Sequence, residues 1–144
     1  MGLTWSRLLV SRYYTMGDVE SRRLPSRSDG YELREQIGSG LSGVVYRAWC
    51  SSIDDEVAIR IIDLDQLQAS LEDIQRDIKV MSLSSHPNVL PFSTCFVSGH
   101  DLWVVMPLLT GGSVSSLLAC AYPDGLPPPV ATYILHSVVA ALDY

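Results

Sequence analysis

The sequence predicts an α+β fold, with a five-stranded antiparallel sheet and one amphipathic helix followed by two more helices. Five segments between positions 31 and 109 are rich in β-branched and aromatic residues and are separated by turn residues, which is typical of strands. One stretch after the third segment carries apolar residues at spacings of three and four, which indicates a helix. The chain has 144 residues, 47% of them hydrophobic, so one compact domain is expected.

The first two strands are predicted at 31–37 and 44–50, and the glycine-rich stretch GSGLSG connects them at 38–43. The third strand, EVAIRIID at 56–63, has Arg60 in its middle. A guanidinium cannot lose its charge, so its burial requires an acidic partner or a bound anion. Arg60 is therefore a candidate functional residue.

The amphipathic helix is predicted within 67–84, because leucine, isoleucine and methionine recur there on one face. Ser70, followed three residues later by Asp73, is a plausible capping start. Pro87 lies just beyond the helix and forbids its continuation.

Two further strands are predicted at 89–97 and 101–109, on either side of a short turn. A short helix at 113–121 and a longer apolar helix from 129 to the last residue follow. No segment is repeated, so the pattern predicts a single unit.

Charge is distributed unevenly along the chain. Residues 1–30 hold five arginines and three acids, whereas residues 31–144 hold five basic and thirteen acidic side chains. An acidic body argues against a nucleic-acid binder, which needs a basic patch. No uncharged stretch reaches the length of a membrane span.

The N-terminal part is predicted to be a disordered leader that ends in an Arg/Ser-rich linker at 17–30. It lacks a continuous apolar stretch, which argues against a secretory signal. Gly2 fits a myristoylation pattern, which would provide the one expected route to a membrane. Met1 and Met16 both remain candidates for the first residue.

The three cysteines are odd in number and far apart: Cys50, Cys95 and Cys120. Their spacing suggests neither a zinc site nor a disulfide framework. We therefore interpret them as core thiols in a reducing compartment and expect a cytoplasmic location.

The stretch GSGLSG has the form G-x-G-x-x-G, for which three interpretations compete. A dinucleotide-binding fingerprint would fit Asp63, twenty residues beyond Gly43, but it requires a helix after the glycines, and 44–50 is β-rich. A plain hairpin needs only one or two glycines. A loop that covers a phosphate between two antiparallel strands uses all three glycines, and the context favours it.

The ordered motifs IGSGLSGVVYRA, VAIR, HPN and LWVVMPLLTGGS resemble those of a protein-kinase N-terminal lobe. The stretches DIKVMSLSSHPNVL, GHDLWVVMP and AYPDGL are most similar to the sterile-20 (germinal-centre) class, and within it to Fray-like kinases of plants. The resemblance covers residues 31–144. It implies an N-lobe at 31–106, a hinge at 107–112 and the start of a C-lobe at 113–144, preceded by the leader at 1–30.

The resemblance also implies an ATP site. The glycine loop would lie over the phosphates, Met106 would stand at the back of the adenine pocket, and the backbone of Pro107 and Leu109 would meet the adenine edge. The implied site residues are Ile37, Gly38, Ser39, Gly40, Gly43, Val45, Ala58, Arg60, Met106, Pro107 and Leu109.

Two polar residues have a structural and a functional interpretation. Ser113 stands where many kinases place a ribose-contacting residue, but we favour an N-cap of the following helix. His86 of the HPN motif is interpreted as a loop residue that ties the helix to the next strand, rather than as a general base.

VAIR stands where the family has VAIK, so Arg60 replaces the lysine that contacts the α- and β-phosphates. Asp77, nine residues before His86, stands where the family has the glutamate that pairs with this lysine. A longer base with a shorter acid roughly keeps the reach, so an Arg60–Asp77 ion pair is predicted. Lys79 lies on another face of the helix and cannot substitute. We expect weak or lost ATP binding, because a planar guanidinium crowds the phosphate site.

The sequence contains no H-R-D-x-x-x-x-N, D-F-G or A-P-E motif. The catalytic base and the magnesium ligands of the family are therefore absent, and no catalytic or metal-binding residue is assigned. We expect the ATP-binding part of a serine/threonine kinase, inactive as it stands, with protein substrates or regulators as partners. The alternative is a non-catalytic, pseudokinase-like interaction module.

Overall fold

A computed structural model describes residues 24–40, 43–65, 71–91 and 93–144, while the side chains at 71–75 and 77 fall outside the description. The predictions on Gly2, Met16 and Ser70 also lie outside it. The elements in chain order are η2 (Ser28–Gly30), β1 (Tyr31–Gly40), β2 (Gly43–Cys50), β3 (Asp55–Asp63), α2 (Leu71–Leu83), β4 (Thr94–Ser98), β5 (Asp101–Pro107), α3 (Val114–Ala121) and α4 (Pro128–Leu142).

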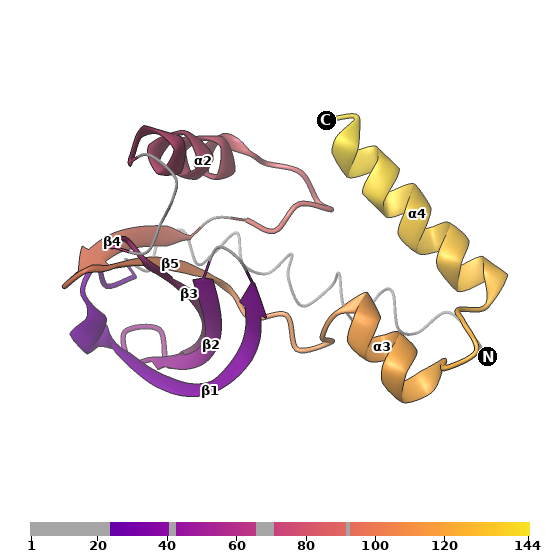
Figure 1. Cartoon of the computed structure of the whole chain (residues 1–144), viewed down its shortest axis with the longest axis horizontal. Coiled ribbons are helices and arrows are strands. Elements are labelled where there is room, and N and C mark those ends of the chain that lie inside the picture. The colour runs from indigo at the N-terminus through magenta and orange to yellow at the C-terminus, as the bar shows by residue number, and fades with distance from the viewer. Residues whose placement is uncertain (1–23, 41–42, 66–70, 92) are drawn as a thin grey trace.

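The five strands form one antiparallel sheet in the order β1-β2-β3-β5-β4, which confirms the predicted α+β fold. The sheet is strongly curved, so that β1 and β2 arch beneath β4 and β5 (Figure 1). Helix α2 lies on the far side of β4 and β5 from that arch, and α3 and α4 stand beside the sheet. The order of elements therefore leaves both long edges of β3 covered by neighbouring strands.

The hydrophobic core lies on the concave face of the sheet. Alternation along β3 sends Val57 and Ile59 to this face, where they are 4% and 0% exposed. The core comprises Tyr31, Ala48, Cys50, Ile53, Val57, Ile59, Phe96, Trp103 and Val105. Three of its aromatic rings stack in series, with centroids 5.9 Å apart between Tyr31 and Phe96 and 5.7 Å between Phe96 and Trp103. Stacked rings and close packing make this core the main source of stability.

The first strand continues to Gly40 rather than ending at Ile37, and two later strand boundaries also differ from the sequence-based prediction. The fourth strand begins at Thr94 rather than at Val89, because the chain first makes a turn in which the Val89 N–H donates to the His86 carbonyl over 3.0 Å. The fifth strand ends at Pro107 rather than at Leu109, since a proline has no N–H to continue the ladder.

The packed chain begins before Tyr31, where the sequence places the domain start. Leu24 is partly buried against the core, and the Tyr31 hydroxyl donates to the Pro25 carbonyl over 2.7 Å. Ser98 also donates through Oγ to Ser28 over 2.9 Å. The last part of the predicted leader therefore belongs to the folded unit.

All three cysteines are free, but only Cys50 is buried. Cys95 is half-buried and Cys120 is exposed on α3, so the interpretation as core thiols is wrong for Cys120. Burial raises the pKa of the Cys95 thiol, which keeps it protonated at neutral pH.

Candidate functional site

The glycine-rich stretch joins two antiparallel strands, as the sequence predicts. Gly38 pairs with Val45, and Gly40 with Gly43, at the turn end of the β1–β2 hairpin. A strand, β2, follows the glycines, so the dinucleotide-binding interpretation is excluded because it requires a helix there.

The glycines on the two strands of the hairpin meet different surroundings. Gly43 has φ +122°, and a Cβ atom built on it would lie 2.3 Å from the backbone oxygen of Ile61. Gly43 is therefore needed by the close approach of β2 to β3. A Cβ at Gly38 would be an ordinary 3.7 Å from the Val45 Cβ, and a Cβ at Gly40 would meet no described atom within 4 Å. The packing of the chain thus explains Gly43 but neither of the other two glycines.

Arg60 lies in the row of strand partners that begins at the glycine hairpin. Its direct partners are Val45 on β2 and Val104 on β5, and Val45 is in turn opposite Gly38. Directly opposed residues of antiparallel strands project from the same face of a sheet. The arginine therefore shares a face with the hairpin, on the side away from the core.

The next row of this face brings two more predicted residues together. Ala58 lies two residues before Arg60 on β3 and is opposite Met106 on β5. Ala58 is buried, and Met106 and Arg60 are half-buried. Ala58 thus lies beside Met106, the predicted back of the adenine pocket, on the adjacent strand.

Four of the predicted residues are exposed, namely Ile37, Ser39, Gly40 and Leu109. Ile37 is 47% exposed and lies where the pairing of β1 with β2 is irregular, between Gln36 and Gly38. Ser39 is exposed and is opposite Val44. Beyond β5, Leu109 is 49% exposed in a turn whose carbonyl accepts from the Gly112 N–H over 3.4 Å. These residues lie at the rim of the face rather than within it.

Ser113 caps the helix that follows the hinge, as predicted. Its Oγ accepts a hydrogen bond from the Ser116 N–H over 3.0 Å at the start of α3. This contact satisfies one of the free N–H groups of the first helical turn.

The structure describes only one side chain of the predicted Arg60–Asp77 ion pair, that of Arg60. Asp77 belongs to α2, but its side chain falls outside the described residues, so the ion pair stays a prediction. Lys79 is exposed on the same helix.

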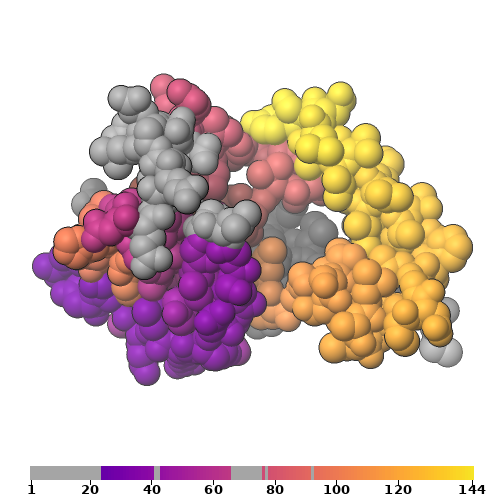
Figure 2. Space-filling model, in the orientation of Figure 1, coloured from indigo at the N-terminus to yellow at the C-terminus, as the bar shows by residue number. Residues whose placement is uncertain are grey.

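The loop that contains the HPN motif contacts α4 and Tyr144 rather than the candidate site. The Asn88 Nδ2 donates to the Ser137 carbonyl over 3.0 Å, and the Ser85 N–H donates to the Tyr144 hydroxyl over 3.1 Å. The His86 ring lies 5.3 Å from the Tyr144 ring, and its Nδ1 accepts from the Asn88 N–H. His86 is therefore a loop residue, as predicted, but the printed contacts join its loop to α4 and Tyr144 rather than to the next strand. In the space-filling view, a hollow separates the sheet from α3 and α4 beneath this loop (Figure 2).

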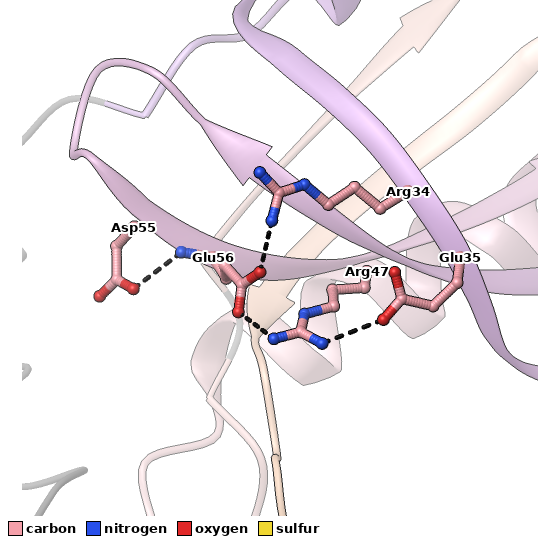
Figure 3. A network of polar contacts seen from close by, with 5 residues as sticks. All are labelled: Arg34, Glu35, Arg47, Asp55 and Glu56. Carbon is pink, nitrogen blue, oxygen red and sulfur yellow. Dashed lines mark hydrogen bonds and ion pairs between the residues drawn. The ribbon is translucent and has the colours of Figure 1, made fainter.

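Sequence reasoning missed a network of charged side chains across β1, β2 and β3 (Figure 3). Glu56 accepts from Arg34 Nη1 over 2.8 Å and from Arg47 Nη2, and Arg47 Nη1 donates to Glu35 over 3.0 Å. The available signal was the presence of opposite charges along the three predicted strands, which does not specify partners.

The network shifts the pKa values of its members. The hydrogen bond from Arg47, helped by the charges of Arg47 and Arg34, holds the pKa of the Glu56 carboxyl below its usual range. A backbone hydrogen bond and then Arg47 lower the pKa of Glu35 in the same way. The two carboxylates raise the pKa of Arg47 further above its already high value. Glu35, Glu56 and Arg47 are therefore charged at neutral pH.

In the described ranges, no three His, Cys, Asp or Glu side chains gather in a way that could hold a metal ion. Among the described helices, none has both the length and the apolar character that crossing a bilayer requires.

Residues 31–144 match the family model described as "Protein kinase domain". The chain is 36% identical over 121 residues to the serine/threonine-protein kinase fray1 of Dictyostelium discoideum, covering 83% of this chain and 21% of that protein. It is 42% identical over 124 residues to fray2 of the same organism, covering 85% and 12%. It is also 32% identical over 117 residues to the STE20-related kinase adapter protein alpha of Bos taurus, covering 79% and 31%. The chain thus spans less than a third of each of these relatives.

Proposed function

The chain belongs to the protein kinase domain family, in its sterile-20 type, and from this premise we propose that it is the ATP-binding portion of a serine/threonine protein kinase. In the family, the activity is phosphoryl transfer from ATP to protein serine or threonine, and the partners are ATP and protein substrates or regulators. The proposal includes a cytoplasmic location, because scattered free cysteines are typical of a reducing compartment.

The observation that carries the proposal is the row of Gly38, Val45 and Arg60 across adjacent strands, with Ala58 and Met106 in the row beside it. A phosphate beneath the glycine hairpin would face the guanidinium of Arg60. An adenine ring beneath Val45 and Ala58 would end at Met106. From the glycine hairpin to Met106, these residues follow the order in which a bound nucleotide would present its phosphates and then its base.

The residues present leave room for ATP, and the guanidinium of Arg60 is expected to weaken its binding by crowding the phosphates. No described atom lies within 4 Å of a Cβ built on Gly40, so the packing of the described chain does not require a glycine there. A phosphate bound close to the backbone would require one. Arg60 would supply positive charge, and the hinge backbone around Leu109 would supply hydrogen-bonding groups. The sequence offers no recognised magnesium ligand, so no metal-dependent step is assigned to these residues.

A thermal-shift titration with Mg²⁺ and ATP at millimolar concentration tests the proposal. Nucleotide at about ten times Kd would stabilise the folded chain by about 1.4 kcal/mol. For a domain of this size, that raises the Tm by several degrees. The absence of any shift up to saturating nucleotide would reject an ATP site in this chain.

Two variants sharpen the titration. Arg60→Lys with Asp77→Glu restores the family's pair and should enlarge the ATP-dependent shift, and in a complete kinase domain it should raise activity. Arg27→Lys is the matched control, because Arg27 is 82% exposed and pairs with Asp29 over 3.4 Å, away from the sheet face. An equal gain in both variants would contradict the role given to Arg60.

The second candidate function is a non-catalytic, pseudokinase-like interaction module. It is favoured by Arg60 in the place of the family's lysine and by similarity to a relative whose name describes an adapter. It predicts a chain that is stable and soluble but unchanged by ATP, so the same titration separates the two functions.

A further inference from the structure

Strand β1 contains a bulge within the charged network defined by Arg34, Glu35, Arg47 and Glu56. Leu33 is opposite Ala48, and Gln36 is opposite Tyr46, so two residues of β1, Arg34 and Glu35, oppose the single residue Arg47. In a regular strand, adjacent side chains project to opposite faces. The bulge lets Arg34 reach Glu56 and Glu35 reach Arg47, and these two partners are hydrogen-bonded to each other.

Glu56 holds this arrangement together because its two oxygens serve different strands. Oε1 accepts from Arg34 of β1, and Oε2 accepts from Arg47 of β2. The Glu56 side chain is 20% exposed, whereas Arg34 and Arg47 are 40% and 37% exposed. The Arg34 guanidinium also lies 5.3 Å from the ring centroid of Trp49, the direct strand partner of Glu56.

The bulge determines the register of everything that follows it on β1. Without the extra residue, each position from Gln36 onward would move by one relative to β2, and its side chain would change face. A second irregularity, at Ile37, lies between the bulge and the hairpin. The pairings of Gly38 with Val45 and of Gly40 with Gly43 depend on both.

We propose that Glu56 is a positioning residue for nucleotide binding, which fixes the bulge at Arg34 and Glu35 and thereby the register of the glycine hairpin opposite Arg60. Its effect is transmitted through β1, and it does not touch the nucleotide itself. The nucleotide part of this inference rests on the proposed function, whereas the effect on register does not.

The variant Glu56→Gln keeps the shape of the side chain and removes its charge, so one of the two arginines loses its acceptor. Arg34→Gln removes only the ion pair between Arg34 of β1 and Glu56, and serves as a second, milder variant. Arg27→Gln is the control, because it breaks an exposed ion pair outside the sheet. Amide hydrogen exchange, resolved by peptide, and ATP affinity are measured for each variant of the full chain.

In Glu56→Gln, we expect exchange within 34–46 to speed up roughly five- to ten-fold while exchange in β5 stays unchanged. ATP affinity should fall roughly five-fold or more, the lower end of coupling between separate sites. Arg34→Gln should show the same pattern more weakly, and Arg27→Gln should match the wild type.

Three results would overturn the inference. Unchanged exchange in 34–46 would mean that the network does not hold the register, and a uniform rise across the sheet would mean that Glu56 is only a general stabiliser. A local rise with unchanged ATP affinity would remove the positioning role. If the wild type binds no ATP, the proposed function fails, and the exchange pattern alone decides whether Glu56 fixes the hairpin.

Discussion

Replacing Gly43 with alanine tests the claim that the fold itself requires this glycine. The new Cβ would lie 2.3 Å from the Ile61 oxygen and 3.1 Å from its carbonyl carbon. The backbone must therefore shift, at a cost of about 1–3 kcal/mol for overpacking. The φ of +122° adds about 1–3 kcal/mol of strain for a residue with a side chain. We expect Gly43→Ala to lose about 2–6 kcal/mol of unfolding free energy, much of the stability of a small domain.

Gly40→Ala is the matched comparison on the opposite strand. Its Cβ meets no described atom within 4 Å, so the free energy of unfolding should change by less than about 1 kcal/mol, with a possible gain from a less flexible unfolded chain. Urea denaturation of both variants, read by tryptophan fluorescence, gives the two differences. Equal stability of Gly43→Ala and wild type would refute the account of this glycine. The proposed function adds that Gly40→Ala weakens ATP binding despite its normal stability.

Three further predictions concern stability. Tyr31→Phe removes the hydroxyl that donates to the Pro25 carbonyl and should cost about 1 kcal/mol in urea denaturation, while the ring stacking remains. Burial, and secondarily Cys50, raises the pKa of Tyr31. The contribution of the neutral hydroxyl to the free energy of unfolding is therefore present below the ordinary tyrosine pKa of about 10 and is lost as pH rises beyond it. Tyr31→Phe should lose less stability at alkaline pH than the wild type. The pKa of Glu56 is lowered, so its pH dependence is the reverse. The contribution of its carboxylate to the free energy of unfolding is present above the ordinary glutamate pKa of about 4.3 and is lost as pH falls through the lower value of the folded chain. Glu56→Gln should therefore lose less stability on acidification than the wild type. Ile59→Ala, at a fully buried position, should cost about 2–5 kcal/mol, and a smaller loss would contradict the assignment of the core.

Much of the fold followed from local patterns. Alternation predicted the first three strands, and the glycine stretch predicted a hairpin between the first two because a β-rich segment follows it. The N-cap at Ser113 was equally local, since a serine before an apolar helical stretch satisfies its own first turn. Boundaries were less secure where proline competes with β-propensity, as at Pro107 and in the chain before Thr94.

The candidate site was predictable as a set of residues but not as a surface. The sequence by itself singled out Gly38, Val45, Ala58, Arg60 and Met106 through motif order. Only the pairing of β2, β3 and β5 determined that these residues share one face, because register is a property of contacts between strands and not of any single strand.

The charged network and the reason for Gly43 depended wholly on tertiary structure. Glu56 lies nine residues from Arg47 and twenty-two from Arg34 in the chain, and nothing in that spacing selects them as partners. Likewise, only the approach of β2 to Ile61 distinguishes Gly43 from Gly40. Periodicity and motif order report which face or turn a residue prefers, whereas distances between segments far apart in sequence arise only when the sheet closes on its core.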